Sequence, residues 1–158
     1  MTPILVLGIG NPFRGDDGVA QCILAELARE DLGSHVTLRD GGTAGLEIAN
    51  LLEGWKTVIV IDALDFGAQP GQVHCRVLDA EQVTRHSVSS NALHSAGLFE
   101  ALALAEALGT LPEHLTLVGV QPRVLQYVAS LSDEVRAAVP VAVKAIVSVL
   151  QAAQNPAI

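Results

Sequence analysis

Three continuous apolar runs constrain the fold of this chain more than any other feature. They are Ile4–Ile9, Thr57–Asp62 with its terminal carboxylate, and Leu115–Val120. Apolar runs of this length without polar alternation are typical of strands buried on both faces of a largely parallel sheet. Helical spacing of apolar residues follows the first run, from Val19 to Leu27. The alternation of such strands with helices predicts one α/β/α sandwich.

Shorter segments complete the expected order of elements. The expected segments are a strand at Val36–Leu38, a helix at Leu46–Leu52, a strand at Gln72–Leu78, a helix at Leu93–Leu108 and a last helix that starts at Ser132. Pro140 is expected to kink or split that last helix. The link from Ile61 to Gln72 is too short for a helical crossover, so the strand after it is not expected to run parallel to the one before. Residues 79–91 are polar and give no clear assignment.

Composition excludes several classes of protein. The 158 residues fit one domain over 1–158, and a hydrophobic content of 50% excludes a disordered chain. A net charge of −8 with only 9 Lys and Arg argues against nucleic acid and against anionic membranes. With no signal peptide and no apolar run of about 20 residues, a soluble cytoplasmic protein is expected. Cys22 and Cys75 lie in apolar stretches and are predicted to be buried free thiols.

Functional sites in open α/β sheets form beyond the carboxyl ends of the strands, and three polar segments follow predicted strands here. They are the loop Gly8–Gly18, the segment Asp62–Asp65 and the glycine-rich stretch Asp40–Gly45. These segments are therefore expected to converge on one edge of the sheet.

The first loop resembles a dinucleotide-binding turn, because Gly8 and Gly10 stand between a strand and a helix. A pyrophosphate needs the positive end of that helix, but Asp16 and Asp17 occupy it and would repel phosphate. A cation suits these two carboxylates better. The alternative is that both aspartates cap the helix, for which Asp16 is a plausible N-cap.

Asp62 and His94 are the other candidates for chemistry. Asp62 ends an apolar run, so it either belongs to a site or bonds turn amides, whereas Asp65 is expected to be a solvated turn residue. His94 precedes an apolar helix, and taken alone it is more often a structural histidine than a ligand. Two carboxylates and one imidazole would bind nickel or zinc weakly. The sequence has no GxSxG or HExxH motif and no evident Ser-His-Asp set, so a hydrolase here would need a metal or a group brought by its substrate.

Four segments in this order resemble the hydrogenase maturation endopeptidases. They are ILVLGIGNPFRGDDG at Ile4–Gly18, DGGTAG at Asp40–Gly45, VIVIDALDFG at Val58–Gly67 and LTLVGVQP at Leu115–Pro122. A histidine at the start of a helix before the last of these segments also fits the family. The match spans about four-fifths of the chain, and four motifs in register are specific where any single one is weak.

The resemblance implies a three-layer α/β/α sandwich with a five-stranded, mostly parallel mixed sheet and one antiparallel strand. It implies that Asp17, Asp62 and His94 contact a metal and carry catalysis. Asp16 is the alternative to Asp17, and His86 is the alternative to His94. It also implies that the residues of the DGGTAG segment recognise substrate. These residues are Asp40, Gly41, Gly42 and Thr43.

The resemblance further implies an endopeptidase that removes the C-terminal extension of a nickel-loaded [NiFe]-hydrogenase large-subunit precursor. Nickel would be supplied by that partner, and the free enzyme, expected to be a monomer, would hold little of it. Two other functions share the same acidic site. One is a stand-alone peptidase with its own zinc, and the other is a non-enzymatic nickel-checkpoint or scaffold module.

Overall fold

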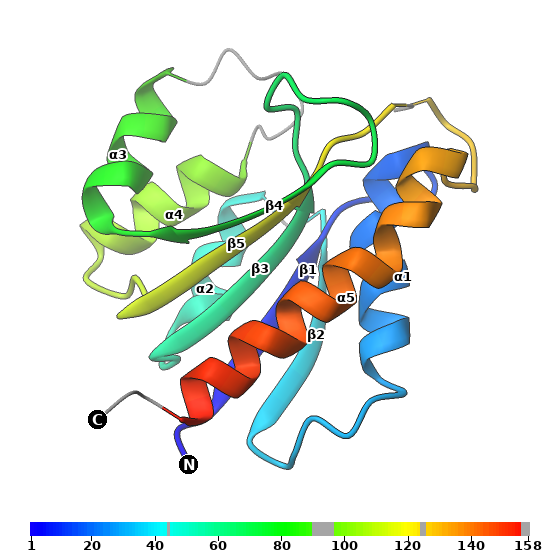
Figure 1. The fold of residues 1–158 in the computed structure, drawn as a ribbon. Helices are drawn as coiled ribbons and strands as arrows, with labels where there is room; N and C mark the ends of the chain where they lie inside the picture. Colours follow the sequence, from blue (N-terminus) through cyan, green and yellow to red (C-terminus); the bar gives the residue numbers. More distant parts are fainter. Residues whose placement is uncertain (44, 90–96, 124–125, 156–158) are drawn as a thin grey trace.

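The computed structural model describes residues 1–43, 45–89, 97–123 and 126–155 (Figure 1). Within them, one five-stranded sheet has the order β2-β1-β3-β5-β4. Its strands are β1 (Ile4–Ile9), β2 (Val36–Gly42), β3 (Thr57–Ala63), β4 (Val73–Leu78) and β5 (His114–Val120). β4 pairs antiparallel with β5, and the other neighbours pair parallel. The expected mixed sheet with one antiparallel strand is confirmed.

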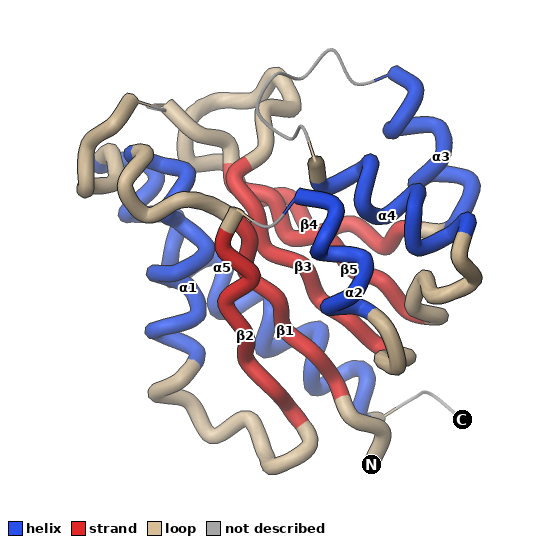
Figure 2. The backbone as a smooth tube through the Cα atoms, turned by 180° about the vertical axis from the view of Figure 1, so that it is seen from behind, coloured by secondary structure: helices blue, strands red, loops and turns tan. Residues whose placement is uncertain are grey.

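Helices cover both faces of this sheet (Figure 2). One layer holds α1 (Val19–Leu27) and α5 (Asp133–Gln154), and the other holds α2 (Ile48–Leu52), α3 (Ala80–Ser89) and α4 (Leu98–Ala107). The short 3₁₀ turns η1 (Gly15–Gly18) and η2 (Gly45–Glu47) lead into α1 and α2. The structure is thus the α/β/α sandwich that the alternation of elements predicted.

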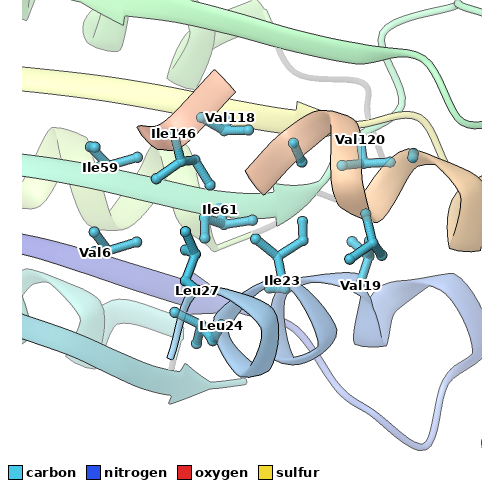
Figure 3. Packing of buried hydrophobic residues seen from close by; sticks show 14 of the residues in the cluster. Val6, Val19, Ile23, Leu24, Leu27, Ile59, Ile61, Val118, Val120 and Ile146 are labelled. Carbon is cyan, nitrogen blue, oxygen red and sulfur yellow. The ribbon is translucent and has the colours of Figure 1, made fainter. Parts of the chain in front are cut away.

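The side chains of β3 explain why its sequence is apolar throughout. Ile59 and Ile61 belong to the core under α1 and α5, together with Ile23 and Ile146 (Figure 3). The intervening Val58 and Val60 belong to the core under α2, α3 and α4. Because successive side chains of a strand point to opposite faces, a strand between two helical layers needs no polar alternation.

Helix α5 is the one helix in the described ranges that is long and apolar enough to cross a membrane by length and composition. It buries Ala138, Ala142 and Ile146 in the core against the sheet, as expected of a helix that covers a sheet. Pro140 lies inside α5, which continues without interruption from Asp133 to Gln154. Of the two outcomes expected at Pro140, a kink or a split, the split is therefore wrong.

β2 is longer than predicted, and α3 is a helix that was not predicted. β2 continues past Leu38 to Gly42, so the first half of the glycine-rich stretch is strand and not loop. Residues 80–89, which gave no clear assignment, form α3. Asp79 and Gln82 cap this helix reciprocally: the Gln82 amide donates to Asp79 Oδ1 and the Asp79 amide donates to Gln82 Oε1, at 2.8 and 2.9 Å. This pair is a capping box, and its residue types three positions apart could have predicted the start of α3 from the sequence.

Both cysteines are exposed free thiols, so the prediction that they are buried is wrong. Cys22 is an exposed residue of α1, and Cys75 lies on the edge strand β4. Partial burial nevertheless raises the pKa of both thiols. A raised pKa lowers the fraction of thiolate, so neither cysteine is an activated nucleophile.

The core beneath α5 gives a direct test of the layer arrangement. Ile146→Ala should lower the free energy of unfolding by about 2–5 kcal/mol, because it leaves a cavity between α5 and the sheet. Val141→Ala, at a position 56% exposed on the same helix, should lower it by less than about 1 kcal/mol. Urea denaturation followed by circular dichroism measures both. Equal losses would contradict the packing of α5 described here.

Candidate functional site

Asp62 is a buried carboxylate at the carboxyl edge of the sheet. It is the penultimate residue of β3, lies opposite Gly119 of β5, and is 4% exposed. Burial raises the pKa of Asp62 well above its usual range, the nearby Asp17 carboxylate raises it further, and a hydrogen bond from the Ala63 amide partly opposes both. The side chain is thus desolvated and near a like charge, a combination found at functional sites.

Asp17 lies in η1, half-buried, and close enough to Asp62 to act on its ionisation. Its Oδ2 accepts a hydrogen bond from the Asn11 amide at 2.9 Å, which fixes the carboxylate against the loop after β1. Gly10, in the same loop, has a φ of 142°, and a side chain there would overlap the carbonyl oxygen of Asp17. Glycine at position 10 therefore allows the loop to pack directly against Asp17.

Asp16 has a structural role that differs from the predicted one. The N-cap of α1 is Gly18 with no side-chain hydrogen bond, so the prediction that Asp16 caps this helix is wrong. The carboxylate of Asp16 is fully buried and accepts from the Arg123 amide at 2.8 Å, the Ser132 amide at 2.7 Å and the Ser132 hydroxyl at 2.9 Å. Asp16 thereby ties η1 to both ends of the segment between β5 and α5.

The candidate substrate residues Asp40–Thr43 form the end of β2 and the turn that follows. Asp40 Oδ1 accepts from the Gly42 amide at 2.8 Å and from Gln21 Nε2 at 3.1 Å. A Cβ at Gly41 would lie 2.8 Å from Ile9 Cδ1, so glycine there permits close approach of β2 to β1. Thr43 is exposed. These residues lie beside the Gly10 loop, because the Gly10 amide donates to Gly42 O at 2.9 Å.

Gln121, which follows β5, is a buried polar residue that the sequence analysis missed. Its Oε1 accepts from the amides of Phe66 and Ala68 at 3.0 and 3.1 Å, and its Nε2 donates to Asp65 Oδ1 at 3.1 Å. Gln121 thus holds the turn that follows Asp62. An amide side chain directly after an apolar strand was the available signal, since such a residue must find partners when buried.

The predicted third donor, His94, lies outside the described residues. Its alternative, His86, is on α3 with its ring 5.0 Å from that of Phe99. Within the described ranges, no three His, Cys, Asp or Glu side chains are grouped so that they could hold a metal ion. His86 therefore does not join Asp17 and Asp62, and the structure brings together two of the three predicted donors.

Comparison with known proteins identifies the family of the chain. Residues 22–149 match the family model described as hydrogenase maturation protease. The chain belongs to the hydrogenase maturation protease family. It is 36% identical over 151 residues to the hydrogenase expression/formation protein HupD of Rhizobium leguminosarum, covering 94% of this chain and 74% of that protein. It is 31% identical over 150 residues to the hydrogenase 2 maturation protease of Escherichia coli, covering 94% and 90%.

Solved structures give the same family and fold. The hydrogenase maturating endopeptidase HybD of Escherichia coli superposes with a TM-score of 0.84 at 29% identity, covering 96% of this chain and 94% of that one. A hydrogenase 2 maturation peptidase from a thaumarchaeon gives 0.72 at 33% identity, covering 94% and 98%. Some relatives are longer, and the chain spans 62% of HupD of Bradyrhizobium diazoefficiens. As a member of this family the chain is an endopeptidase of hydrogenase maturation.

A large hollow in this maturation protease lies away from the carboxylate pair. It has a volume of about 1090 Å³, is open to solvent, and runs between α1 and α5, where Cys22 and Val143 are among its lining residues. It reaches the loop after β1 and the start of α1 at Pro12, Gly15, Gly18 and Gln21, but neither Asp17 nor Asp62 lines it. The hollow therefore does not define the candidate site.

The different roles of the two adjacent aspartates can be tested by stability. Asp16→Ala should lower the free energy of unfolding by about 3 kcal/mol, because it leaves three donors without their acceptor. Asp17→Ala removes one hydrogen bond and should cost roughly 1 kcal/mol. Chemical denaturation at neutral pH measures the difference. A larger loss for Asp17→Ala than for Asp16→Ala would reverse the assignment.

The buried carboxyl of Asp62 should make stability depend on pH. Its pKa is raised in the folded state, so the native protein binds the proton more tightly than the unfolded chain, and stability falls as pH rises from about 4 toward the native pKa. Asp62→Asn removes this loss. The variant should melt at a higher temperature than the wild type at neutral pH, with the difference shrinking in acid.

The measurement is the melting temperature between about pH 4 and pH 8, a range that begins near the ordinary pKa of aspartate. Asp31→Asn is the matched control, because Asp31 is exposed. A wild type and an Asp62→Asn variant with parallel pH profiles would show that Asp62 is not desolvated.

Proposed function

We propose that this maturation protease removes the C-terminal extension of a [NiFe]-hydrogenase large-subunit precursor only after nickel has entered that precursor. The observation that carries this proposal is the pair formed by Asp17 and Asp62, in which a buried carboxyl lies near a second negative charge. A cation bound to this pair would offset both the cost of burying an ionised carboxylate and the repulsion between the two carboxylates. The family supplies the hydrogenase precursor as the partner.

The donor set suits a metal that arrives as cargo of the substrate. Two carboxylates are a small, oxygen-only set that binds free divalent ions weakly, and nickel accepts both oxygen and imidazole ligands. A site with too few ligands of its own gains affinity when the partner protein supplies the remaining ones. Nickel would then add binding energy that only the loaded precursor has, which makes it a checkpoint.

His94 is proposed as the third donor. A Cβ at Gly97, the first described residue after it, would lie 3.5 Å from the Cα of Gly45, which ends the DGGTAG segment. This contact places Gly97 beside the end of the DGGTAG segment, and the choice of His94 follows the family resemblance. α4, which Gly97 caps, covers the face that the even-numbered side chains of β3 enter.

The substrate tail is proposed to bind along Asp40–Thr43, beside the loop that carries Asp17. Two nearby exposed side chains suit a protein partner: Phe13 is 70% exposed and Tyr127 is 82% exposed. The hydrogen bond from the Gly15 amide to Val128 O, at 2.7 Å, holds their two segments together. Exposed aromatic side chains next to a site are typical of protein-binding surfaces.

A cytoplasmic monomer is the form proposed to act, since the precursor is loaded with nickel before it assembles. In the bound state nickel could also polarise the scissile carbonyl or activate a water. The chain's own part in cleavage is to orient the loaded precursor by Asp17, Asp62 and His94.

Substitution of the three proposed donors tests the function. Asp62→Ala, His94→Ala and Asp17→Asn should each fold and should each lower cleavage of a nickel-loaded precursor by more than about 100-fold, the size of effect expected when an essential site group is lost. The assay is the loss of mass of the precursor by mass spectrometry. The exposed His114 gives the control His114→Ala, which should cleave normally.

Two further outcomes separate the alternative functions. Cleavage of a nickel-free precursor, with stoichiometric zinc in the purified protein, would identify a stand-alone zinc peptidase. Capture of the loaded precursor without any change in its mass would identify a non-enzymatic checkpoint. Normal cleavage by a folded Asp62→Ala variant would remove Asp62 from the site.

A further inference from the structure

Gln21, the third residue of α1, joins two segments of the site that are separate in sequence. Its Nε2 donates to Gly10 O at 2.9 Å and to Asp40 Oδ1 at 3.1 Å. Gly10 belongs to the loop that packs on Asp17, and Asp40 belongs to the proposed substrate segment at the end of β2. One amide group thus bridges the two halves of the site.

The bridge closes a ring of hydrogen bonds. The Gly10 amide donates to Gly42 O at 2.9 Å, and the Gly42 amide donates to Asp40 Oδ1 at 2.8 Å. Together with the two bonds from Gln21, these bonds form a ring that runs from Gly10 to Gly42, then to Asp40, then to Gln21 and back to Gly10. Each member is therefore held from two sides, which fixes the separation of the β2 end from the loop after β1 more firmly than a single bond would.

The ring is connected to the carboxylate pair through Gly10. A side chain at position 10 would overlap Asp17 O, so the backbone of Gly10 is in direct contact with Asp17. The next residue, Asn11, donates its amide to Asp17 Oδ2 at 2.9 Å. A shift of Gly10 would therefore displace the Asp17 carboxylate relative to Asp62.

The chemistry of the side chain excludes a role in packing alone. Both atoms that receive bonds from Gln21 Nε2 are acceptors, so the orientation of the amide is determined: Oε1 in that position would repel them. The buried Oε1 has no hydrogen-bond partner among the described residues. An unpartnered buried acceptor opposes folding, and an apolar side chain of the same length would avoid it. The benefit of Gln21 must therefore come from its two donated bonds.

We propose that Gln21 is a positioning residue of this protease, which holds the substrate segment Asp40–Thr43 in register with the loop that carries Asp17. This inference rests on the proposed function, because it assumes that the two segments act together on the precursor tail. Gln21 is not one of the proposed metal donors and is not proposed to contact the scissile bond. It acts through Gly10 and Asp40.

The test compares Gln21→Leu with the matched control Gln151→Leu, which makes the same change on the exposed side of α5. The substrate is the full-length, nickel-loaded precursor. Gln21→Leu should lower kcat/KM about tenfold, as expected for loss of a hydrogen bond to a charged group, and mainly through a higher KM. Gln21→Glu should lower it further, because it places a carboxylate against Asp40.

Coupling distinguishes positioning from a general structural effect. Asp40→Asn should partly rescue Gln21→Glu, since an amide at position 40 can donate to the new carboxylate, and Asp40→Asn with Gln21→Leu should lose less than the sum of the two single losses in free energy. Amide hydrogen exchange at Gly10 and Gly42 should also be faster in Gln21→Leu than in the wild type. This last readout needs no activity.

The outcomes are separable. A wild type that leaves the loaded precursor uncut contradicts the proposed function, while slowed or unchanged exchange at Gly10 and Gly42 in Gln21→Leu overturns the positioning role by itself. With an active wild type, a Gln21→Leu variant that cleaves as well as Gln151→Leu also overturns it. Strict additivity with Asp40→Asn, or no rescue of Gln21→Glu, does the same.

Discussion

The burial of the Asp62 carboxyl is the interaction on which the rest of the site depends. β3 lies between two helical layers, so a side chain at its end enters surroundings in which a charge is costly. Asp17 adds a like charge, and Asp62 takes part in no salt bridge within the described ranges. The fold therefore keeps a carboxyl whose ionisation is unfavourable at this edge of the sheet. In the proposed function, a cation brought by the precursor stabilises the ionised form of this carboxyl.

The loops around Asp62 are fixed by side chains that do no chemistry. Gln121 bonds the turn that follows Asp62, and Asp16 bonds the two ends of the segment before α5. On the other side of the site, the lack of a Cβ at Gly10 lets the backbone contact Asp17, and the lack of a Cβ at Gly41 lets β2 approach β1 closely. Because the carboxylate pair depends on the separation of several loops, this rigidity is what makes a two-carboxylate site specific.

The strands and the layers could be predicted from sequence because they follow from unbroken apolar runs such as Thr57–Asp62. The antiparallel direction of β4 could be predicted from the length of the link between β3 and β4, because this link is too short for a helical crossover. The site was less predictable. Asp16 and Asp17 are adjacent and chemically identical, but a 3₁₀ turn separates consecutive side chains by about 120°, so one enters the core and the other approaches Asp62. Sequence carries no signal for that rotation. Cys22 was misjudged because it precedes the apolar Ile23 and Leu24, although the helical spacing of the buried residues of α1 leaves position 22 exposed.

An incomplete site is better suited to a checkpoint than a complete one. A set of donors that bound free nickel tightly would be occupied before the precursor arrived and would no longer report whether the precursor was loaded. If nickel in the precursor adds about 2.8 kcal/mol through Asp17, Asp62 and a third donor, loaded precursor is preferred over empty precursor about 100-fold. That preference needs no tight site in the free enzyme. In the proposed function it needs only that Asp17 and Asp62 be held where the loaded precursor binds, and the hydrogen bonds of the surrounding loops favour this.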